Sequence, residues 1–411
     1  MTDWAGKKVL MIGAARQGIA LSRYLANKGT KVILNDRRSD EELTAAREEL
    51  EGLDISWVTG DHPIEILDGV DMVCLSGGIP LNLPLVQAAV QRNIPLSNDS
   101  QIFLESAPCP VIGITGSSGK TTTTALVGEI AKQHFAFKKT DNQVWVGGNI
   151  GNPLIQEIDL MKEDDIAVIE LSSFQLEIMT VSPNIAAVLN LTPNHLDRHG
   201  SMSKYISAKS NILTNQRSED VAVLNRDDPR VRELFPEVKG RQITFGLNPP
   251  YNKQDSTYYK RGKLYLQASG QVAKVIKAEL INLRGTHNLY NTLAAVAISA
   301  AARFSLAAIY GGIVAFQGVP HRLEFVRDWG GAAWYNDSIA TSPERAIAAL
   351  DSFDEPIVLL AGGRDKDLPW ETFGERIQQK VDLSPGGTSF DEFSDFEERG
   401  KRFRQWVKEL T

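Results

Sequence analysis

Residues 113–121 carry the strongest chemical signal in the chain. They read Gly-Ile-Thr-Gly-Ser-Ser-Gly-Lys-Thr, follow an apolar run typical of a strand and precede a run typical of a helix, which is the context of a phosphate-binding loop. Gly116 and Gly119 let backbone N–H groups converge on phosphate oxygens at a helix N-terminus. Lys120 would reach the outer phosphates and Thr121 a magnesium ion. The pattern predicts a nucleoside triphosphate site, which a kinase, an ATPase, a GTPase or a ligase could use.

Three further side chains could act with such a site. Glu170 ends the apolar run 165–170, a position from which a carboxylate can reach the metal of a nucleotide. His195 lies with Asp197 in a polar loop, and Lys209 follows shortly after it. Each also has a plain structural explanation: a charge at the end of a strand, a histidine that stabilises a loop, and a solvated lysine on an amphipathic helix.

A second glycine-rich segment, 13–18, resembles a dinucleotide-binding loop after the first apolar run. Ala15 stands where such loops carry the glycine that admits the pyrophosphate of the cofactor, so an NAD site is disfavoured. The diphosphate of a UDP-sugar still suits this segment, with Asp36 and Arg37 placed for the uracil side. The Ser-Gly-Gly turn at 76–78 is either a further diphosphate contact or a plain tight turn.

The composition excludes several classes of function. The chain has 411 residues, of which 42% are hydrophobic and 23% charged, as in globular proteins of more than one domain. A net charge of -7 argues against a nucleic-acid partner. No run approaches membrane-spanning length and no cleavage pattern follows the N-terminus. Because the two cysteines, Cys74 and Cys109, fit free thiols in a reducing compartment, we expect a cytoplasmic protein.

The elements that must position these residues alternate between strand and helix. The apolar runs that predict strands lie at 9–12, 32–34, 70–75, 94–96, 111–114, 166–169, 186–189, 221–224 and 357–360. A polar β-hairpin is expected at 250–275 and an alanine-rich helix at 289–303. Since Pro108 and Pro110 interrupt the pattern and it starts again near residue 319, we expect three α/β domains at 1–107, 108–318 and 319–411.

Taken together, these motifs resemble those of the Mur ligase family, and within it the branch that adds D-glutamate. The resemblance covers nearly the whole chain, and beyond the phosphate loop it rests on 147–151 (Gly-Gly-Asn-Ile-Gly), 170–177 (Glu-Leu-Ser-Ser-Phe-Gln-Leu-Glu), 194–199 (Asn-His-Leu-Asp-Arg-His), 285–291 (Gly-Thr-His-Asn-Leu-Tyr-Asn), 320–324 (Pro-His-Arg-Leu-Glu) and 336–338 (Asn-Asp-Ser). Ser-Ser-Phe-Gln-Leu and the stretch 383–391 favour the D-glutamate branch. The implied fold has an N-terminal Rossmann-like domain for the UDP moiety, a central P-loop ATPase-type domain, and a C-terminal Rossmann-like domain that closes over the nucleotide.

The resemblance implies an ATP- and magnesium-dependent ligase that joins D-glutamate to UDP-N-acetylmuramoyl-L-alanine in peptidoglycan precursor synthesis. The alanyl carboxylate would attack the γ-phosphorus of ATP, and the amine of D-glutamate would displace phosphate from the resulting acyl phosphate. Two magnesium ions and a carbamylated Lys209 are implied, because a carbamate offers anionic oxygens where an ammonium would repel a metal. A monomer with neither a nucleic-acid partner nor membrane insertion is expected.

The resemblance also implies a role for individual positions. The catalytic set is Lys120, Glu170, His195 and Lys209, and the metal ligands are Thr121, Glu170, His195 and carbamylated Lys209. The ATP set comprises Gly116, Gly119, Lys120, Thr121, Thr122, Asn288, Asn291, Arg322 and Asp337. The UDP-substrate set is Gly13, Arg16, Gln17, Asp36, Arg37, Ser76, Gly77, Asn149 and His195. The D-glutamate set is Thr341, Lys366, Ser389 and Phe396, in keeping with the lysine and hydroxyl donors that a dianionic amino acid requires.

Two departures from the family pattern stand out. Residues 337–342 read Asp-Ser-Ile-Ala-Thr-Ser where the family often has Asp-Ser-Lys-Ala-Thr-Asn, so a cation is absent at Ile339, and Arg345 or another residue could replace it. The C-terminal domain looks short, because about two strand and helix units are missing between 377–381 and 383–385 for a complete doubly wound sheet. A sister Mur ligase, a folylpolyglutamate-type ligase and a nucleotide-binding scaffold without ligase activity therefore stay open as alternatives.

Overall fold

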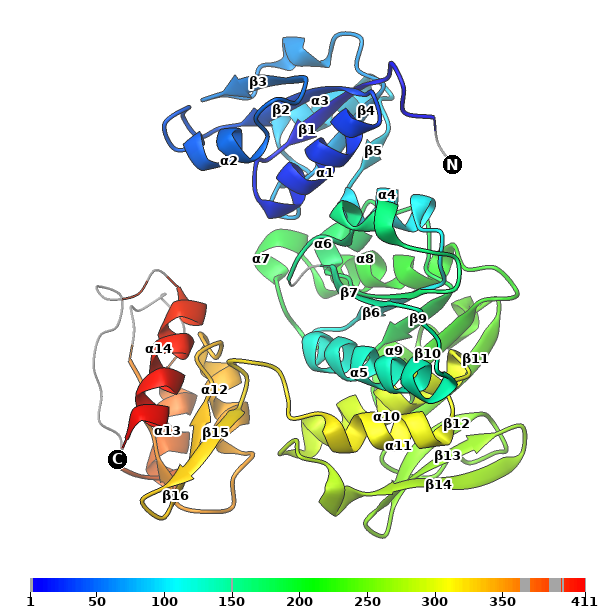
Figure 1. The fold of residues 1–411 in the computed structure, drawn as a ribbon, viewed down its shortest axis with the longest axis vertical. Helices are drawn as coiled ribbons and strands as arrows, with labels where there is room; N and C mark the ends of the chain where they lie inside the picture. The colour runs from blue at the N-terminus through cyan, green and yellow to red at the C-terminus, as the bar shows by residue number, and fades with distance from the viewer. Residues whose placement is uncertain (1–2, 149–150, 363–369, 384–392, 394, 411) are drawn as a thin grey trace.

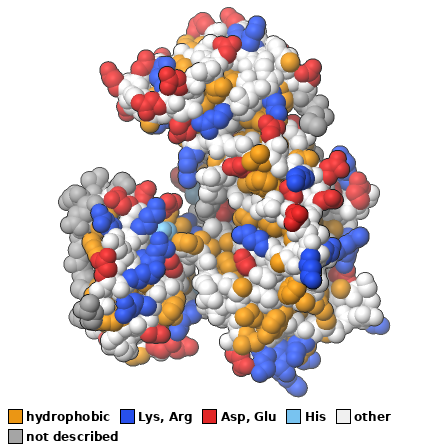
Figure 2. Space-filling model, viewed as in Figure 1, with side chains coloured by type: hydrophobic (Ala, Val, Ile, Leu, Met, Phe, Trp, Pro, Cys, Tyr) orange, Lys and Arg blue, Asp and Glu red, His pale blue; other side chains and the backbone are white. Residues whose placement is uncertain are grey.

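A computed structural model describes residues 3–148, 151–362, 370–383, 393 and 395–410. Figure 1 shows three α/β bodies, with the N-terminal body at the top, the central body below it and the C-terminal body beside the central one. This architecture confirms the predicted fold class. Figure 2 shows open space between the N-terminal and C-terminal bodies, each of which lies against the central body.

The N-terminal body is a five-stranded parallel sheet in the order β3-β2-β1-β4-β5. Its elements are β1 (Lys8–Ile12), α1 (Arg16–Asn27), β2 (Lys31–Asp36), α2 (Thr44–Glu49), β3 (Ile55–Thr59), the 3-10 helix η1 (Ile64–Leu67), β4 (Met72–Leu75), α3 (Pro84–Gln91) and β5 (Leu96–Ser97). The strand order reverses direction between β1 and β4, so the glycine loop after β1 and the turn after β4 meet at the carboxyl ends of these strands. Such a crevice is where open α/β sheets bind ligands.

The central body is a nine-stranded sheet in the order β14-β13-β12-β11-β10-β9-β6-β8-β7. Its strands are β6 (Val111–Thr115), β7 (Val144–Gly148), β8 (Ile166–Glu170), β9 (Ile185–Val188), β10 (Val221–Asn225), β11 (Arg241–Gly246), β12 (Ser256–Lys260), β13 (Lys263–Ala268) and β14 (Gln271–Lys277). The pairs among β6 to β11 are parallel, and β12 to β14 form an antiparallel edge. The predicted polar hairpin at 250–275 is therefore a three-stranded ribbon.

Helices cover both faces of this sheet. They are α5 (Lys120–Lys138), α6 (Ser173–Leu176), α7 (Leu196–His199), α8 (Met202–Thr214), α9 (Pro229–Arg232), α10 (Thr286–Ala301) and α11 (Leu306–Ala315), with 3-10 turns η2 (Leu154–Gln156), η3 (Ile158–Leu160), η4 (Phe235–Glu237) and η5 (Ala278–Leu280). Helices α5, α10 and α11 share one apolar core with the sheet. A second core continues from α1 and α4 (Asp99–Ser106) into the central body. The N-terminal and central bodies are therefore packed together, and Cys74 and Cys109 are free and buried there, as predicted.

The C-terminal body contains β15 (Glu324–Trp329), β16 (Ala332–Asn336), α12 (Pro343–Leu350), β17 (Ile357–Val358), α13 (Glu371–Lys380), β18 (Val381–Leu383) and α14 (Phe396–Glu409). Its described strands form two two-stranded sheets, β15-β16 and β17-β18. The strand predicted at 357–360 ends at Val358. Val358, Leu360 and Trp406 are 63%, 56% and 53% exposed, which fits the expectation that a strand and helix layer is missing.

Arg284 fixes how the C-terminal body lies on the central one. Its Nε donates a hydrogen bond of 2.9 Å to Tyr335 Oη, and its Nη1 donates to both carboxylate oxygens of Glu355 at 2.9 Å. The guanidinium also lies over the ring of Phe353, 5.0 Å from its centroid. These contacts place the C-terminal body beside the N-terminus of α10 and close to the phosphate loop.

Asp99, at the start of α4, provides a test of the junction between the first two bodies. It is 5% exposed, its Oδ1 has no hydrogen-bond partner among the described residues, and burial raises its pKa from 3.8 to about 6. The buried Asp99 therefore lowers the free energy of unfolding progressively as the pH rises from 3.8 towards 6, and the full loss persists above that. We expect Asp99→Asn to raise the free energy of unfolding at pH 8 by up to about 2 kcal/mol.

The gain should shrink as the pH falls from about 6 towards 3.8, because Asp99 takes up its proton in the folded chain first, and it should vanish below 3.8, where the unfolded chain is protonated as well. Chemical denaturation at pH 4.5 and pH 8 measures this difference. The exposed Asp54, for which Asp54→Asn should change little at either pH, is the matched control. An equal gain for Asp99→Asn at both pH values would contradict the assignment of the penalty to buried charge.

Candidate active site

The phosphate loop lies between β6 and α5, as its sequence predicts. Gly116 and Gly119 have φ angles of 159° and 81°, and a Cβ atom at Gly119 would collide with Oδ1 of Asn291. A side chain at either glycine would be strained, so the loop needs both. Lys120 Nζ donates to the carbonyl of Gly116 at 3.0 Å and lies 4.0 Å from Oε1 of Glu170, which keeps the ammonium folded over the loop.

Thr121 and Glu170 place two oxygen donors together beside this loop. Glu170 ends β8, is 3% exposed and lies next to β6 in the sheet, where it is paired with Ile114. The hydroxyl of Thr121 donates to Oε2 of Glu170 at 2.9 Å. A hydroxyl and a buried carboxylate at a phosphate site fit Mg²⁺, which takes few protein ligands and fills its shell with phosphate oxygens and water. No cluster of three or more His, Cys, Asp or Glu suited to a metal occurs among the described residues, and this kind of site needs none.

Lys209 of α8 is buried directly under the loop, not solvated. It is 2% exposed, and Nζ donates to Thr115 Oγ1 at 3.2 Å and to the carbonyl of Gly116 at 3.1 Å. Burial, together with the charge of Lys120, lowers the pKa of Lys209 well below its usual value, although Glu170 opposes this. The burial of Lys209 therefore favours its neutral form more than water does.

His195 lies at the start of the short helix α7, with φ of 53°, in the loop that follows β9. Its ring is 5.1 Å from that of Phe174. Burial lowers the pKa of His195; the charge of Asp197 raises it, and those of Lys120 and Lys209 lower it further. The imidazole is thus neutral near pH 7, the form that can ligate a metal.

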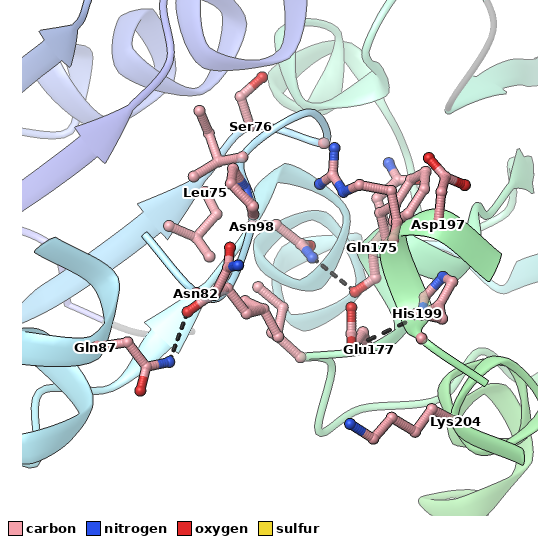
Figure 3. A pocket seen from close by; sticks show the side chains of 18 residues that line it. Leu75, Ser76, Asn82, Gln87, Asn98, Gln175, Glu177, Asp197, His199 and Lys204 are labelled. Atoms are coloured by element: carbon pink, nitrogen blue, oxygen red, sulfur yellow. Dashed lines mark hydrogen bonds and ion pairs between the residues drawn. The ribbon is translucent and has the colours of Figure 1, made fainter. Parts of the chain in front are cut away.

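A cleft of about 410 Å³ opens between the N-terminal and central bodies (Figure 3). Arg198 of α7 crosses this junction, and its two terminal nitrogens donate to the carbonyl of Gly78 at 3.3 and 3.2 Å. The guanidinium lies 4.9 Å from the ring centroid of Phe174, which stacks parallel to His199 at 5.2 Å. Arg198 was not predicted as a site residue, although its place within the His-Leu-Asp-Arg-His motif indicated one.

The turn after β4 lines the cleft on the side of the N-terminal body, and the glycine loop packs against this turn. Gly13 has φ of 97°, and a Cβ atom there would meet the Cβ of Ser76 at 2.9 Å. Gln17 Oε1 accepts a hydrogen bond from the Gly77 N–H at 3.2 Å. The proposed diphosphate residues Gly13, Gln17, Ser76 and Gly77 are therefore brought together, and Arg16 is exposed at the start of α1.

Asp36 is engaged within the protein. Its carboxylate accepts hydrogen bonds from the Ala14 N–H at 2.8 Å and from Arg38, with which it forms an ion pair at 2.8 Å. Burial raises the pKa of Asp36, but the bonds from Arg38 and Ala14 outweigh it and lower the pKa to about 2. The neighbouring Arg37 is exposed. The structure thus shows that Asp36 is held by Arg38, a residue that the sequence did not single out.

Residues assigned to ATP come from two bodies. Asn291 Nδ2 donates to Asn288 Oδ1 at 2.9 Å, and the pair lies against the phosphate loop, where Thr122 is also buried. In the C-terminal body, Asp337 Oδ1 accepts the N–H of Leu323 at 2.9 Å, and burial raises the pKa of Asp337 to about 6.

Arg322 lies between two residues with left-handed backbone, His321 (φ 65°) and Leu323 (φ 42°). Burial lowers the pKa of Arg322, Arg345 lowers it further, and Glu170 and Asp337 raise it. Glu170 belongs to the central body, so the charge of Arg322 in the C-terminal body lies within electrostatic reach of it. Backbone strain of this kind clusters at functional sites.

The residues assigned to D-glutamate are only partly described. Thr341 N–H donates to the carbonyl of Ile339 at 2.8 Å, and the ring of Phe396 lies edge-on to His321 at 6.4 Å. Lys366 and Ser389 lie outside the described residues, as does Asn149 of the UDP-substrate set. The roles of this set remain predictions.

Comparisons with known proteins agree with this architecture. Residues 7–98 match the Mur ligase MurD-like N-terminal domain, and residues 114–299 match the Mur ligase middle domain. The UDP-N-acetylmuramate-alanine ligase MurC of Thermotoga maritima has a similar structure, with a TM-score of 0.56 and 21% identity over 98% of this chain and 88% of that one. A pseudomurein peptide ligase type C of Methanothermus fervidus gives a TM-score of 0.53 and 17% identity over 99% of this chain and all of that one. Within the described residues, no helix is long and apolar enough to cross a membrane.

Two relatives with higher sequence identity to this chain than these structures carry the same name. The UDP-N-acetylmuramoylalanine--D-glutamate ligase of Pelotomaculum thermopropionicum is 36% identical over 100% of this chain and 99% of its own length, and that of Clostridioides difficile is 39% identical over 92% and 82%. The first alignment runs over 459 positions although this chain has 411 residues, so it contains several dozen positions that this chain lacks. The phosphate loop, the domain order and these relatives lead to one conclusion: the chain belongs to the Mur ligase family.

Proposed function

We propose that this protein is an ATP- and Mg²⁺-dependent ligase that joins D-glutamate to UDP-N-acetylmuramoyl-L-alanine, a step in peptidoglycan precursor synthesis. The observation that carries the proposal is the match, over nearly the whole chain, to ligases named for this reaction. The geometry supports it, because the central body carries a nucleotide loop with a buried acid beside it, and a cleft of about 410 Å³ opens between the central and N-terminal bodies. The supply of ATP and UDP-linked precursors favours the cytoplasm as its location.

The first chemical step is phosphoryl transfer. The alanyl carboxylate attacks the γ-phosphorus, a new O–P bond forms, the β–γ bridge breaks, and ADP and an acyl phosphate result. Lys120, folded over the loop, stabilises the charge that develops on the transferring group. Thr121 and Glu170 would hold a magnesium ion, which would supply positive charge to offset that of the phosphate oxygens.

The second step forms the amide. The amine of D-glutamate attacks the acyl carbon, the tetrahedral intermediate expels phosphate, and the amine loses its proton. The acyl phosphate must be shielded from water during this step. The C-terminal body, held at the junction by Arg284, is placed to provide that shield.

We assign Lys209 a modified role in this chemistry. Carbamylation joins a neutral amine to CO₂ and releases a proton, and the lowered pKa of Lys209 favours the neutral amine. The carbamate would place an anionic group under the phosphate loop, and this group could help to hold a second magnesium ion. The same burial makes an unmodified ammonium costly there.

The UDP-sugar is assigned to the cleft between the first two bodies. The diphosphate would bind at the Gly13 loop, Gln17 and the Ser76–Gly77 turn, which the structure brings together. The uracil would lie towards Asp36 and Arg38, and the alanyl end would point towards His195. We predict that the protein is a monomer.

Phosphate release tests the assignment. With ATP, Mg²⁺ and UDP-N-acetylmuramoyl-L-alanine present, we expect release to depend on D-glutamate, and L-glutamate, L-alanine and L-lysine to give background rates. A site built for one stereoisomer rejects the other because its carboxylate partners would be left unpaired. Release with another amino acid would move the protein to a sister ligase.

The second candidate function is a nucleotide-binding protein without ligase activity. It is favoured by the C-terminal body, whose described strands form only two-stranded sheets and leave Val358 and Leu360 exposed. Such a protein would bind Mg·ATP and release no phosphate with any amino acid. The same assay therefore separates the two candidates.

A further inference from the structure

Arg198 of α7 has no role in the function proposed above. Its two terminal nitrogens donate hydrogen bonds to the carbonyl oxygen of Gly78, at 3.3 and 3.2 Å. Gly78 follows Ser76 and Gly77, and these three residues form the turn after β4, the diphosphate turn. Ser76 comes from the N-terminal body, and Asp197, the neighbour of Arg198, from the central one (Figure 3). A side chain of the central body is therefore bonded to the diphosphate turn of the N-terminal body.

The guanidinium of Arg198 is held in place by a stack of rings. It lies 4.9 Å from the ring centroid of Phe174, and Phe174 stacks on His199 at 5.2 Å with an angle of 5° between the rings. His199 is 4% exposed, and its Nε2 lies 3.0 Å from Oγ of Ser173. A cation over an aromatic face is attracted to it and keeps its N–H groups for other partners. The stack thus orients the guanidinium beside the diphosphate turn.

Arg198 keeps donors for a ligand. A guanidinium carries five N–H groups, and the two bonds to the carbonyl of Gly78 use two of them. Within the described part of the chain, Arg198 makes no other hydrogen bond and no ion pair within 4.0 Å. Its side chain is exposed and lines the cleft. Three N–H groups of a positively charged side chain are therefore open to a molecule in the cleft.

A diphosphate needs positive charge at this turn. The residues that the structure brings together for it are uncharged: Gly13, Gln17, Ser76 and Gly77. Among the described residues that line the cleft, the lysine and arginine side chains are those of Arg198 and Lys204, and the carboxylates are those of Glu177 and Asp197. Of the two cations, Arg198 is the one bonded to the turn. Its planar fork matches phosphate oxygens, which accept two parallel bonds from a guanidinium.

The strand order indicates which phosphate Arg198 would meet. The sheet runs β3-β2-β1-β4-β5, the expected uracil side follows β2, the glycine loop follows β1, and the diphosphate turn follows β4. A UDP group laid along this edge places its uracil, its α-phosphate and its β-phosphate in the same order. Arg198, bonded to the turn after β4, therefore lies at the end of the β-phosphate, which carries the sugar.

We propose that Arg198 binds the β-phosphate of the UDP-linked substrate and is the cationic partner that the central body supplies to the diphosphate turn. The proposal rests on the proposed function, in which the UDP-linked substrate occupies this cleft. Because the same guanidinium is bonded to Gly78, the bound diphosphate also holds the N-terminal and central bodies together at this point.

Binding of two uridine nucleotides tests this without ligase turnover. Dissociation constants are measured for UDP, which has a β-phosphate, and for UMP, which lacks one. We expect Arg198→Ala to weaken the binding of UDP about tenfold or more, which is the loss of a charge-assisted hydrogen bond, and to change that of UMP less than about twofold. UDP-N-acetylmuramoyl-L-alanine should lose affinity as UDP does.

Two further variants separate a phosphate contact from a role in holding the turn. Arg198→Lys keeps the positive charge, whereas Arg198→Gln loses it and keeps an N–H donor for the carbonyl of Gly78. We expect UDP affinity to fall in the order wild type, Arg198→Lys, Arg198→Gln, with Arg198→Gln close to Arg198→Ala. Arg217→Ala, at an exposed arginine of the central body, should bind both nucleotides as the wild type does. Thermal melting of each variant checks that the fold is intact.

Several results would overturn the proposal. They are an equal loss for UDP and UMP, no loss for either, or an Arg198→Gln variant that binds UDP at least as well as Arg198→Lys, which would make Arg198 a support of the turn alone. Wild-type protein that releases phosphate with D-glutamate while Arg198→Ala binds UDP normally would keep the ligase function and remove this role of Arg198. Wild-type protein and variants that bind UDP and UMP as expected but release no phosphate would defeat the ligase function and leave the role of Arg198 supported.

Discussion

Lys120→Ala is expected to lower the rate of D-glutamate-dependent phosphate release about a thousandfold. The ammonium lies 3.0 Å from the carbonyl of Gly116 and 4.0 Å from Glu170, where it meets the charge that grows on the transferring phosphoryl group. Removing one such preorganised donor commonly costs about a hundredfold to a thousandfold. Because Lys120 also neutralises Glu170, its loss leaves a buried carboxylate unpaired and adds to the effect.

The rate is measured as phosphate release at saturating ATP and UDP-N-acetylmuramoyl-L-alanine. Lys132→Ala, at an exposed lysine of the same helix, should behave as the wild type. Lys120→Arg should remain strongly impaired, because a planar guanidinium does not reproduce a compact ammonium at a phosphate loop. Near-normal turnover of Lys120→Ala would contradict the assignment of this loop to phosphoryl transfer.

The second large effect is expected at Lys209. Lys209→Met keeps much of the buried volume and removes both the amine and any carbamate, and we expect turnover to fall about a hundredfold or more. Folding should not suffer, because a 2% exposed lysine whose pKa is lowered by burial is replaced by an apolar side chain. We therefore expect Lys209→Met to lose activity while its melting temperature stays close to that of the wild type.

Carbon dioxide distinguishes a carbamate from a plain lysine. Wild-type protein kept in CO₂-depleted buffer should lose activity and regain it when bicarbonate is added, and Lys209→Met should respond to neither treatment. Carbamate forms from the neutral amine, so the loss in limiting CO₂ should deepen as the pH falls towards the lowered pKa of Lys209. Full activity of wild-type protein without CO₂ would remove the carbamate from the mechanism.

The sequence predicted those parts of the fold that local patterns specify. The apolar runs that became β1, β6, β8 and β9 are buried in the middle of parallel sheets, where burial on both faces leaves a continuous apolar signature. The phosphate loop was predictable because its glycines are required by φ angles and close contacts that no other residue tolerates. Glu170 was predicted as a site residue because it stands at the end of such a strand.

Features that depend on partners distant in sequence were not predictable. The apolar run at 357–360 indicates a strand, but pairing decides its length, and within the described part of the chain β17 pairs with β18 alone. Lys209 could be taken for a solvated helix residue until α8 was seen to pack under the loop. Arg38 and Arg198 were missed because hydrogen bonds to a carboxylate and to a carbonyl of another body leave no periodic trace in the sequence.

The most direct test of the account follows an oxygen atom. UDP-N-acetylmuramoyl-L-alanine labelled with ¹⁸O in its alanyl carboxylate is incubated with MgATP, D-glutamate and the protein, and the released phosphate and the amide product are analysed by mass spectrometry. The account predicts one ¹⁸O atom in each phosphate, because the carboxylate oxygen leaves with the phosphoryl group as the amide forms. Unlabelled phosphate would show hydrolysis of ATP by water, and phosphate without amide product would show that no amide bond forms. Either result would contradict the assignment as a ligase.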